Sequence, residues 1–474
     1  MIHIEQPAFY TRELRSCLEQ RHLLKSELPF RESVVDWHIQ EGLIKTEEGI
    51  KKTKKGFICL RCGQHERSFF ARYPCYRCSK CCVYCRSCVM MGRVSDCTPL
   101  LTWHMHVSHK WAPVHTEWKG ALSAGQEKAA KSIINAIRRK EELLVWAVCG
   151  SGKTELLFQG IEFALNNGLT VCIATPRTDV VLELAPRFRQ AFPGVEIAAL
   201  YGGSSDVGNL SPLIISTTHQ LLRYKEAFDV IIIDEVDAFP YSIDNTLQYA
   251  VKKSAKRQSA HIYLTATPSA DMKKRAESGK LDTVRIPARF HRSPLPEPTL
   301  IWCGNWKKSL KRRKVPFRLK KWLFKHQELQ QPVFLFVPSV PVLKSVVSVL
   351  KKETFRAEGV YADDPDRNEK VNRFRESKLE VLVTTTILER GVTVKKAQVG
   401  VLGAESAVFT ESALVQMAGR AGRHPEHTDG DVCFFHYGRT KSMNAARRHI
   451  QNMNKMSKKE MLIDQSDIHG KVYL

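Results

Sequence analysis

The chain has 474 residues, of which 43% are hydrophobic and 26% charged, and this balance excludes wholesale disorder. Its length indicates about three domains. Lys and Arg (73) outnumber Asp and Glu (49), so the net charge of +24 favours a polyanionic partner, either nucleic acid or an anionic membrane face. No apolar run approaches the ~20 residues of a membrane span, and the N-terminus lacks signal-peptide features. We therefore expect a cytosolic protein.

The first feature along the chain is a cysteine-rich motif within residues 57–92. Eight of the 14 cysteines lie between Cys59 and Cys88, in the segments CLRC, CYRC and CRSC and the pair CC. Two C-x2-C pairs supply the four thiolates that Zn²⁺ prefers, so the motif predicts zinc binding. The outer pairs are separated by 22 residues, a spacing typical of zinc ribbons.

The choice of zinc ligands stays open on spacing alone. Pairing with the CYRC segment (Cys75, Cys78) would leave a shorter loop and a second set of thiols, including Cys81 and Cys82, for another ion. Small buried core residues are the usual form of free cysteine. We expect that role for the other six, which are Cys17, Cys97, Cys149, Cys172, Cys303 and Cys433.

From about residue 120, short apolar runs alternate with helical stretches. The predicted strands are ELLVWAV, TVCIA, EIAAL, PLIIST, DVIIIDE and HIYLTA, followed after residue 290 by PVFLFVP, EVLVTTT, QVGVLG and VCFFHY. Runs that are apolar on both faces suit parallel sheets covered by helices. The sequence predicts an N-terminal zinc-binding region (1–118) and two tandem α/β domains (119–290 and 291–474).

A phosphate-binding loop follows the first of these strands. The segment AVCGSGKT, Ala147 to Thr154, stands between a strand and a helical stretch, as such a loop requires. Gly150 and Gly152 would let backbone N–H groups face the phosphates. Lys153 would bridge the β- and γ-phosphates, and the Thr154 hydroxyl would ligate Mg²⁺.

A strand ending in carboxylates, VIIIDEVD, lies about 80 residues further on. Asp234 would hold Mg²⁺, and Glu235 would polarise the attacking water. A lone Asp-Glu at a strand end is more often a solvated cap, but the P-loop upstream favours a catalytic pair.

Three more segments follow in order: LTATP, TTTILERGVTV and QMAGRAGR. Arg420 and Arg423 are three residues apart, so on one helical turn they would share a face. Two guanidiniums in an interdomain cleft could neutralise the γ-phosphate as charge develops. Arginines at this spacing more often form a solvated face, but the small residues around these two favour close packing.

Taken in order, these motifs resemble those of superfamily 2 helicases and translocases, and the match covers residues from about 120 to 450. The resemblance implies two RecA-like domains. Gln126 in LSAGQEKAA is similar to the glutamine that contacts adenine in that superfamily. The residues thus expected to bind nucleotide are Gln126, Gly150, Ser151, Gly152, Lys153, Thr154 and Gly391, and those expected to be catalytic are Lys153, Asp234, Glu235, Arg420 and Arg423.

More narrowly, the cysteine region continuing into YCRSCVMMGR, together with WAVCGSGKTE and DEVDAFPY, closely resembles the ComFA family, the late competence ATPases of transformable Gram-positive bacteria. The resemblance implies an ATP-driven motor for single-stranded DNA taken up through the ComEC channel, with ComFC and DprA as partners. It also implies Cys59, Cys62, Cys85 and Cys88 as the zinc ligands. A position at the inner face of the membrane and a homo-oligomer are compatible with this reading.

The positive charge is concentrated in the last domain, which carries +14 of the +24. The run Asn305 to Lys325 has ten basic residues and no acidic one. Trp306, Phe317, Trp322 and Phe324 are interleaved with them, a composition typical of single-strand binding paths. A solvated basic helix whose aromatic rings pack on the domain is equally compatible, as is a patch facing anionic lipid.

The sequence therefore predicts a DNA-stimulated ATPase with ATP between two RecA-like domains. The segments Thr265 to Thr267 and Thr384 to Thr393 would couple hydrolysis to grip on the strand. Two alternatives stay open: a replication-restart or repair helicase, and a zinc-dependent DNA-binding scaffold with a vestigial motor.

Overall fold

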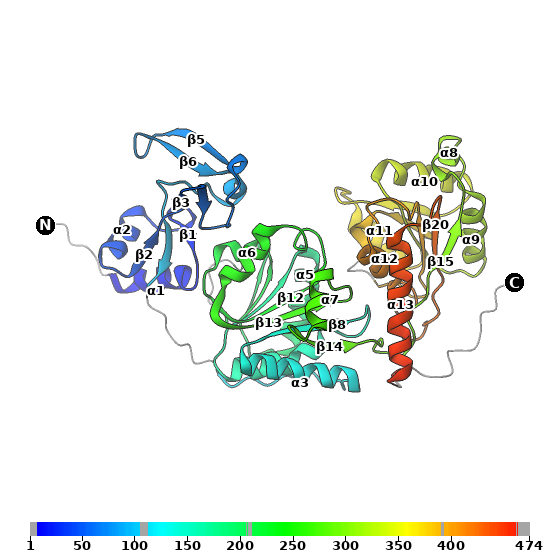
Figure 1. Cartoon of the computed structure of the whole chain (residues 1–474), viewed down its shortest axis with the longest axis horizontal. Coiled ribbons are helices and arrows are strands. Elements are labelled where there is room, and N and C mark those ends of the chain that lie inside the picture. The colour runs from blue at the N-terminus through cyan, green and yellow to red at the C-terminus, as the bar shows by residue number, and fades with distance from the viewer. Residues whose placement is uncertain are drawn as a thin grey trace.

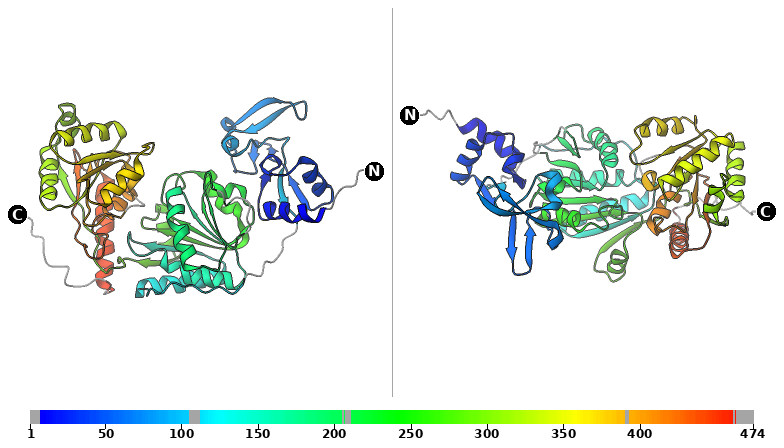
Figure 2. Two further views of the ribbon diagram at one scale, coloured as in Figure 1. Left: turned by 180° about the vertical axis from the view of Figure 1, so that it is seen from behind. Right: turned by 90° about the horizontal axis from the view of Figure 1, so that it is seen from above.

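The computed structural model describes residues 7–104, 112–204, 206, 211–389, 393–460 and 462. Three parts follow one another along the chain: an N-terminal region, domain 1 and domain 2. Domain 1 lies between the other two in every view (Figures 1 and 2). Among the residues that the structure describes, no helix has the length and apolarity needed to cross a membrane.

The N-terminal region combines a small antiparallel sheet with two hairpins. Strand β7 lies in the middle of the sheet, between β1 and β2. Helices α1 and α2 supply Leu14, Leu18 and Val35 to the core beside it, where Trp103 is also buried. The elements are α1 (Pro7–Leu18), β1 (Leu23–Leu24), α2 (Glu32–Gln40), β2 (Ile44–Glu47), the hairpin β3 (Ile50–Thr53) and β4 (Gly56–Cys59), the hairpin β5 (Phe70–Cys75) and β6 (Lys80–Cys85), and β7 (Leu100–Trp103).

Domain 1 is built on a seven-stranded parallel sheet in the order β10-β11-β9-β12-β13-β8-β14. Its inner strands are continuous apolar runs because helices cover both faces. Helices α3, α4 and α5 pack on one face, whereas α6 and the cysteine-bearing hairpins pack on the other. The elements are α3 (Ala124–Arg139), β8 (Glu142–Ala147), α4 (Phe158–Asn166), β9 (Val171–Thr175), α5 (Thr178–Ala191), β10 (Ile197–Leu200), β11 (Leu213–Thr217), β12 (Phe228–Asp234), α6 (Asn245–Ser254), β13 (Ala255–Thr265), α7 (Ala270–Glu277) and β14 (Asp282–Ile286).

Domain 2 has a six-stranded parallel sheet in the order β15-β20-β19-β16-β18-β17. Helices α8, α9 and α10 pack on one face, and α11, α12 and α13 on the other. The elements are β15 (Thr299–Trp302), α8 (Trp306–Lys311), α9 (Phe317–Glu328), β16 (Val333–Phe336), α10 (Val340–Lys352), β17 (Ala357–Val360), α11 (Arg367–Arg375), β18 (Val381–Thr384), β19 (Gln398–Leu402), α12 (Glu411–Ala418), β20 (Val432–His436) and α13 (Lys441–Lys459).

The predicted fold class, two tandem parallel-sheet domains behind a small cysteine-rich region, is confirmed. Every strand predicted from an apolar run is present. In the two parallel-sheet domains three strands were not predicted, β14, β15 and β17, and no strand was predicted in the N-terminal region. All three lie at sheet edges, where one side of the strand has no neighbour and the sequence needs no continuous apolar run.

Candidate functional site

The P-loop turns between β8 and α4. Gly150 (φ +82°) and Gly152 (φ +70°) are in the left-handed region, which side chains disfavour. At Gly152 there is also no room, since a Cβ would lie 2.4 Å from the amide nitrogen of Gln126. The sequence predicted a helix from Thr154 onward, but a 3-10 turn, Glu155–Leu157, comes first and α4 begins at Phe158.

Gln126 holds the P-loop in place through side-chain hydrogen bonds. Its side chain is 1% exposed, and its Nε2 donates to the carbonyl oxygens of Ser151 (2.9 Å) and Gly152 (3.1 Å). Its Oε1 accepts from the backbone N–H of Ser123 (2.8 Å) in the capping box that begins α3. The structure thus places Gln126 against the phosphate-binding loop, and its contact with adenine stays a prediction.

Asp234 is the last residue of β12, and Glu235 follows it, beside the P-loop. The backbone N–H of Glu235 donates to Asp234 Oδ1 at 2.9 Å. Glu235 has φ +57°, a conformation that costs a non-glycine residue about 1–2 kcal/mol. Strain of this kind persists where the surrounding structure holds a residue for a purpose, so it fits a positioned catalytic carboxylate.

Arg420 and Arg423 come from domain 2. The sequence predicted both on one helical turn, and this is wrong in detail: α12 ends at Ala418, and both arginines lie in the turns that follow. Arg420 is 4% exposed, and its Nε donates to the backbone oxygen of Glu389 (2.8 Å). The small residues around them permit this tight turn, and Gly422 has φ +59°.

These groups meet at one cavity of about 550 Å³ between the two domains, a volume in the range of small-molecule sites. Domain 1 contributes the P-loop, Asp234 and Glu235, and domain 2 contributes the two arginines. All the residues predicted as catalytic line it. Other lining residues include Glu155, Arg187, Glu389, Thr393 and Gln416. Gly391, predicted to bind nucleotide, lies outside the described residues.

The donor set of the cavity suits a nucleoside triphosphate and its metal. Backbone N–H groups at the glycine turn and the ammonium of Lys153 are phosphate ligands. The Thr154 hydroxyl and the Asp234 carboxylate are hard oxygen donors of the kind Mg²⁺ takes. With arginines opposite, the arrangement can neutralise charge on a transferring phosphoryl group from both sides.

Sequence reasoning missed a cross-domain contact made by Arg289. This side chain follows β14, is 2% exposed, and its guanidinium donates to three carbonyl oxygens of the arginine-bearing loop: those of Gly419 (3.3 Å), Ala421 (2.9 Å) and Gly422. Burial lowers its pKa to about 10. The next residue, Phe290, donates its N–H to the Gly150 oxygen (2.9 Å). Arg289 and Phe290 together therefore contact both the arginine-bearing loop of domain 2 and the P-loop of domain 1.

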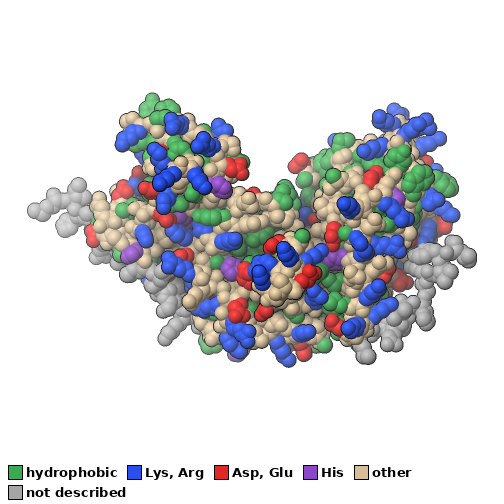
Figure 3. Space-filling view, in the orientation of Figure 1, with side chains coloured by type: hydrophobic (Ala, Val, Ile, Leu, Met, Phe, Trp, Pro, Cys, Tyr) green, Lys and Arg blue, Asp and Glu red, His purple; other side chains and the backbone are tan. Residues whose placement is uncertain are grey.

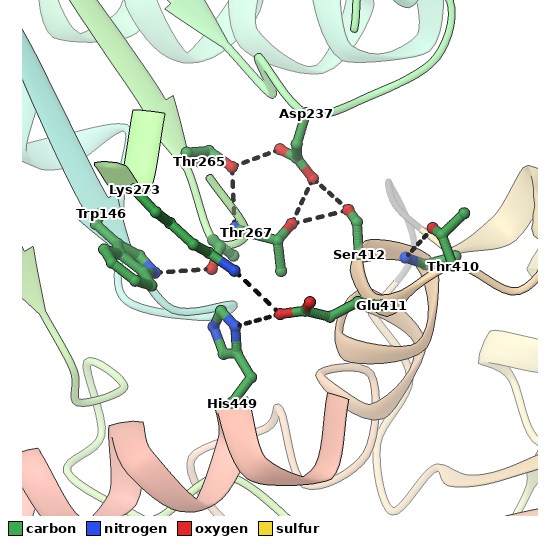
Figure 4. Close-up of polar contacts among 11 residues, drawn as sticks. Trp146, Asp237, Thr265, Thr267, Lys273, Thr410, Glu411, Ser412 and His449 are labelled. Carbon is green, nitrogen blue, oxygen red and sulfur yellow. Dashed lines mark hydrogen bonds and ion pairs between the residues drawn. The ribbon is translucent and has the colours of Figure 1, made fainter. Parts of the chain in front are cut away.

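A second polar contact joins the domains at the end of β13 (Figure 4). Asp237 accepts from the hydroxyls of Thr265 and Thr267 (both 2.6 Å), and from Ser412 of α12 (2.6 Å). Beside it, Glu411 accepts from Lys273 of domain 1 (3.2 Å) and lies 3.2 Å from His449 Nδ1. The His449 hydrogen bond, with Lys273, lowers the pKa of Glu411 to about 2.

This network connects two of the predicted motifs. The Asp237 carboxylate, the last of DEVD, accepts from both hydroxyls of LTATP. Asp237 and Thr267 both contact Ser412 of α12, the helix that leads to the arginines. In the TTTILERGVTV segment, Thr384 is buried and donates to the Val360 oxygen (3.0 Å), while Thr393 lines the cavity. Residues 390–392 lie outside the described part of the chain.

The N-terminal thiols form two separate groups. The first is Cys59, Cys62, Cys85 and Cys88, all buried, whose sulfurs lie within 4.8 Å of one another. The Cys59–Cys88 and Cys62–Cys85 sulfurs are 3.7 Å and 3.6 Å apart. Four sulfurs held tetrahedrally about 2.3 Å from Zn²⁺ would be about 3.8 Å apart, so this set fits the ion.

This first group lies against domain 1. Lys253 of α6 donates to the Arg61 oxygen (2.9 Å), and the Tyr249 hydroxyl donates to the Leu60 oxygen (3.2 Å). Gly63 faces the Tyr249 ring so closely that a Cβ would lie 2.5 Å from it. The thiols share one apolar core with the sheet of domain 1.

The second group is Cys75, Cys78, Cys82 and Cys97. The prediction that Cys97 is an ordinary core residue is therefore wrong, since Cys97 is half-buried beside other thiols. Of the remaining five, Cys172 and Cys433 are buried as predicted, whereas Cys17, Cys149 and Cys303 are only partly buried. Cys149 donates to Gln416 Oε1 across the domain boundary (2.9 Å).

The basic run occupies α8 and α9 on the outer face of domain 2, where Figure 3 shows Lys and Arg gathered. Its aromatic rings do not form a continuous path. Trp306 (1% exposed) and Trp322 (6%) pack in the core, and Phe324 packs on Phe355. Phe317 is 78% exposed and borders a groove with Lys321 and Lys325. For both tryptophans the packing alternative is confirmed.

Three family models match the chain: the competence protein ComFA N-terminal domain (residues 6–102), the type III restriction enzyme res subunit (119–270) and the helicase conserved C-terminal domain (315–425). The competence protein ComFA of Bacillus subtilis strain 168 is 56% identical over 97% of this chain and 98% of its own length. The chain belongs to the ComFA family. The ComFA of Streptococcus pneumoniae strain R6 is 38% identical over 78% of this chain and 86% of its own.

A solved structure with the same fold is that of Saccharomyces cerevisiae Dbp5 bound to RNA and ADP BeF3. It has a TM-score of 0.50 at 14% identity, and the match covers 72% of this chain and 96% of that one. This likeness supports the two RecA-like domains. ATPase activity of the helicase type is implied by the family models for residues 119–270 and 315–425.

Proposed function

We propose that the chain is an ATP-dependent motor that moves along single-stranded DNA and drives DNA uptake during competence. The observation that carries the proposal is the interdomain cavity. It brings the P-loop, a carboxylate pair and two arginines together from domains that are separate in sequence. Membership of the ComFA family supports a role of that motor in competence.

Hydrolysis of ATP in this cavity would use both walls. Lys153 and the P-loop N–H groups bind the β- and γ-phosphates, and Thr154 and Asp234 hold Mg²⁺. Glu235 orients the attacking water and accepts its proton. Arg420 and Arg423 neutralise the charge that develops on the γ-phosphoryl group, and they can do so only when the domains are together. Mg²⁺ held by these oxygen donors would supply further neutralisation of the phosphate charge.

Motion would follow from the way the domains meet. The polar contacts of Ser412, Glu411 and Arg289 with the opposite domain can break and re-form, because water can replace these hydrogen bonds. The Asp237 carboxylate links the hydroxyls of LTATP to α12, so a change at the nucleotide can reach the strand-gripping segments.

The DNA path would use the positive charge of domain 2. Nine of the ten basic residues between Asn305 and Lys325 are exposed, and Phe317 offers one ring for stacking. The proposed partners are single-stranded DNA, ComFC, DprA and the ComEC channel, at the inner face of the membrane. The proposal also includes contact of the same basic surface with anionic lipid and assembly of the protein as a homo-oligomer.

Displacement of streptavidin from the end of a biotinylated single strand tests the motor. The expected result is ATP-dependent displacement by the wild-type protein and none by Lys153→Ala. Streptavidin retained at every ATP concentration would contradict translocation. A forked duplex in the same assay separates the alternatives: unwinding would favour a restart helicase, and DNA binding insensitive to ATP and to Lys153→Ala would favour a scaffold.

A further inference from the structure

Three thiols of the second group lie on the β5–β6 hairpin, whose turn points away from domain 1 (Figure 1), and the fourth lies in a different segment. We propose that Cys75, Cys78, Cys82 and Cys97 bind a second Zn²⁺ ion, separate from the first set, and that this ion fixes the end of the hairpin. The proposal stands on the geometry of these four residues and does not depend on the motor function.

The strand register selects which cysteines of the hairpin can share an ion. Cys75 pairs with Lys80, and Tyr73 pairs with Cys82, so Cys75 and Cys82 lie on one face of the two-stranded ladder. Cys81 pairs with Pro74 and lies on the other face, where it is exposed. Alternation along β6 therefore includes Cys82 in the group and excludes its neighbour.

The fourth thiol comes from a different segment. Residues 94–96 run antiparallel beside β6: the Cys85 N–H donates to the Val94 oxygen (2.9 Å), and the Asp96 N–H donates to the Val83 oxygen (3.0 Å). This pairing delivers Cys97 to the hairpin, with its sulfur 3.6 Å from that of Cys75. The two backbone hydrogen bonds hold Cys97 beside the hairpin thiols, a placement that suits a metal ligand better than an ordinary core residue.

The sulfur separations suit a tetrahedral metal and no disulfide. All four sulfurs lie within 4.8 Å of one another, and the Cys78 and Cys82 sulfurs are 3.2 Å apart. A disulfide needs about 2.05 Å, whereas four sulfurs around Zn²⁺ are about 3.8 Å apart. The first set shows similar separations, so the two groups have the same ligand chemistry and geometry.

The surroundings of the group stabilise a thiolate site. The Ser95 hydroxyl lies 3.3 Å from Cys97 Sγ, and the Tyr73 hydroxyl lies 3.8 Å from it. The Arg93 guanidinium stacks over the Tyr73 ring at 4.3 Å. Four thiolates around Zn²⁺ carry a net charge of −2, and the two hydroxyl donors beside Cys97 offset part of it.

The hairpin also needs a cross-link of this kind. A two-stranded hairpin is marginal in water by itself, and this one ends in a fully exposed Tyr76 with little apolar surface to bury. Small elements without a sufficient core are commonly held by metal ions. A zinc ion between the turn, β6 and the Cys97 segment supplies that constraint.

Zinc content of the full-length protein, purified under reducing conditions, tests the proposal. We expect two zinc ions per chain in the wild type, one in Cys97→Ser, and two in Cys81→Ser. Cys81→Ser is the matched control, because it removes a neighbouring thiol that lies in β6 on the opposite face of the hairpin. One zinc in the wild type, or unchanged zinc in Cys97→Ser, would overturn the proposal.

The cobalt content of the wild-type protein is a second measurement, and it does not depend on the folding of a variant. Wild-type protein produced with Co²⁺ in place of zinc should hold two cobalt ions per chain, both with the absorption of tetrahedral thiolate coordination. Trypsin should then cleave at Arg77 or Lys80 faster in Cys97→Ser than in Cys81→Ser, because the hairpin end has lost its cross-link. A single thiolate-bound cobalt, or equal cleavage of the two variants, would contradict the site.

Discussion

Domain 1 has two interfaces that differ in kind. Its contact with domain 2 encloses a cavity of about 550 Å³ and combines polar side chains with apolar packing, since Val148 of domain 1 is buried in the core of domain 2. Single side chains such as Ser412 and Arg289 cross it. Its contact with the N-terminal region is apolar, and the first set of cysteines lies in the same buried core as the sheet. One interface is hollow and hydrogen-bonded, and the other is packed.

The difference indicates which parts move. Separating domain 1 from domain 2 breaks hydrogen bonds that water can replace, so its net cost is modest. Separating the N-terminal region would expose buried apolar side chains at roughly 25 cal/mol per Å². We therefore expect changes at the first interface to alter turnover, and changes at the second to alter stability.

The largest effect is expected from Lys153→Ala. Removing the cation from the phosphate site should lower DNA-stimulated ATP hydrolysis by about 100-fold or more, while the melting temperature stays within error of the wild type. Steady-state phosphate release and thermal unfolding measure the two quantities. Lys131→Ala, at an exposed position of α3, is the control and should leave both unchanged. Equal turnover in the two variants would contradict the assignment of the cavity.

The double variant Cys59→Ser and Cys62→Ser should have the opposite profile. If the four thiols packed against α6 hold zinc, their loss should destabilise the N-terminal region by several kcal/mol, because structural zinc contributes directly to folding. Thermal unfolding should acquire an early transition, while turnover per folded motor changes little. Cys81→Ser serves as the exposed control. If unfolding stays single and unshifted, the packed interface is not held by these thiols.

Arg289→Met tests the interface between domains 1 and 2. Arg289 is not among the residues to which we assign a contact with the nucleotide. The substitution removes three hydrogen bonds to the loop that carries Arg420 and Arg423, so that loop loses its position. We expect kcat to fall about ten-fold, the cost of roughly 1.4 kcal/mol in the transition state, with a smaller change in KM for ATP. Lys280→Met, an exposed cation just before β14, is the control. A change confined to the melting temperature would make Arg289 merely structural.

A smaller effect concerns pH at the packed interface. His22 is 1% exposed, and burial lowers its pKa to about 4, while the close contact of its Nε2 with Glu47 Oε2 (3.0 Å) lowers the pKa of that carboxyl to about 2. Below about pH 6.5 the unfolded chain binds a proton at His22 that the folded chain does not, so stability falls as pH drops toward 4.

Chemical denaturation at pH 7 and pH 5 measures this loss. The His22 contribution should be about 2 kcal/mol at pH 5. His22→Gln keeps a donor for Glu47 but cannot titrate, and its stability should depend less on pH. If the stability of the wild type and of His22→Gln depended on pH in the same way, His22 would not be the cause of the loss at low pH.

Much of this arrangement could be predicted from the sequence because its signals are local. The strands buried on both faces are continuous apolar runs, and the P-loop and the DEVD carboxylates are contiguous motifs whose spacing implies their chemistry. The edge strands β14, β15 and β17 carry no such run, since edges bury less surface.

Contacts between distant segments could not be predicted in this way. Arg289 stands alone in its segment, and only the fold brings it to the loop after α12. Cys97 has no C-x2-C partner, so its place among the hairpin thiols follows only from strand pairing. Likewise, the burial of Trp306 and Trp322 depends on how α8 and α9 pack, not on their composition.

The rate of ATP hydrolysis, compared in the presence of single-stranded DNA, duplex DNA and RNA, tests the central claim most directly. A DNA-driven motor working at the hollow interface predicts the strongest stimulation by single-stranded DNA, and its loss in both Lys153→Ala and Glu235→Gln. Stronger stimulation by RNA, or turnover that ignores both substitutions, would contradict the account.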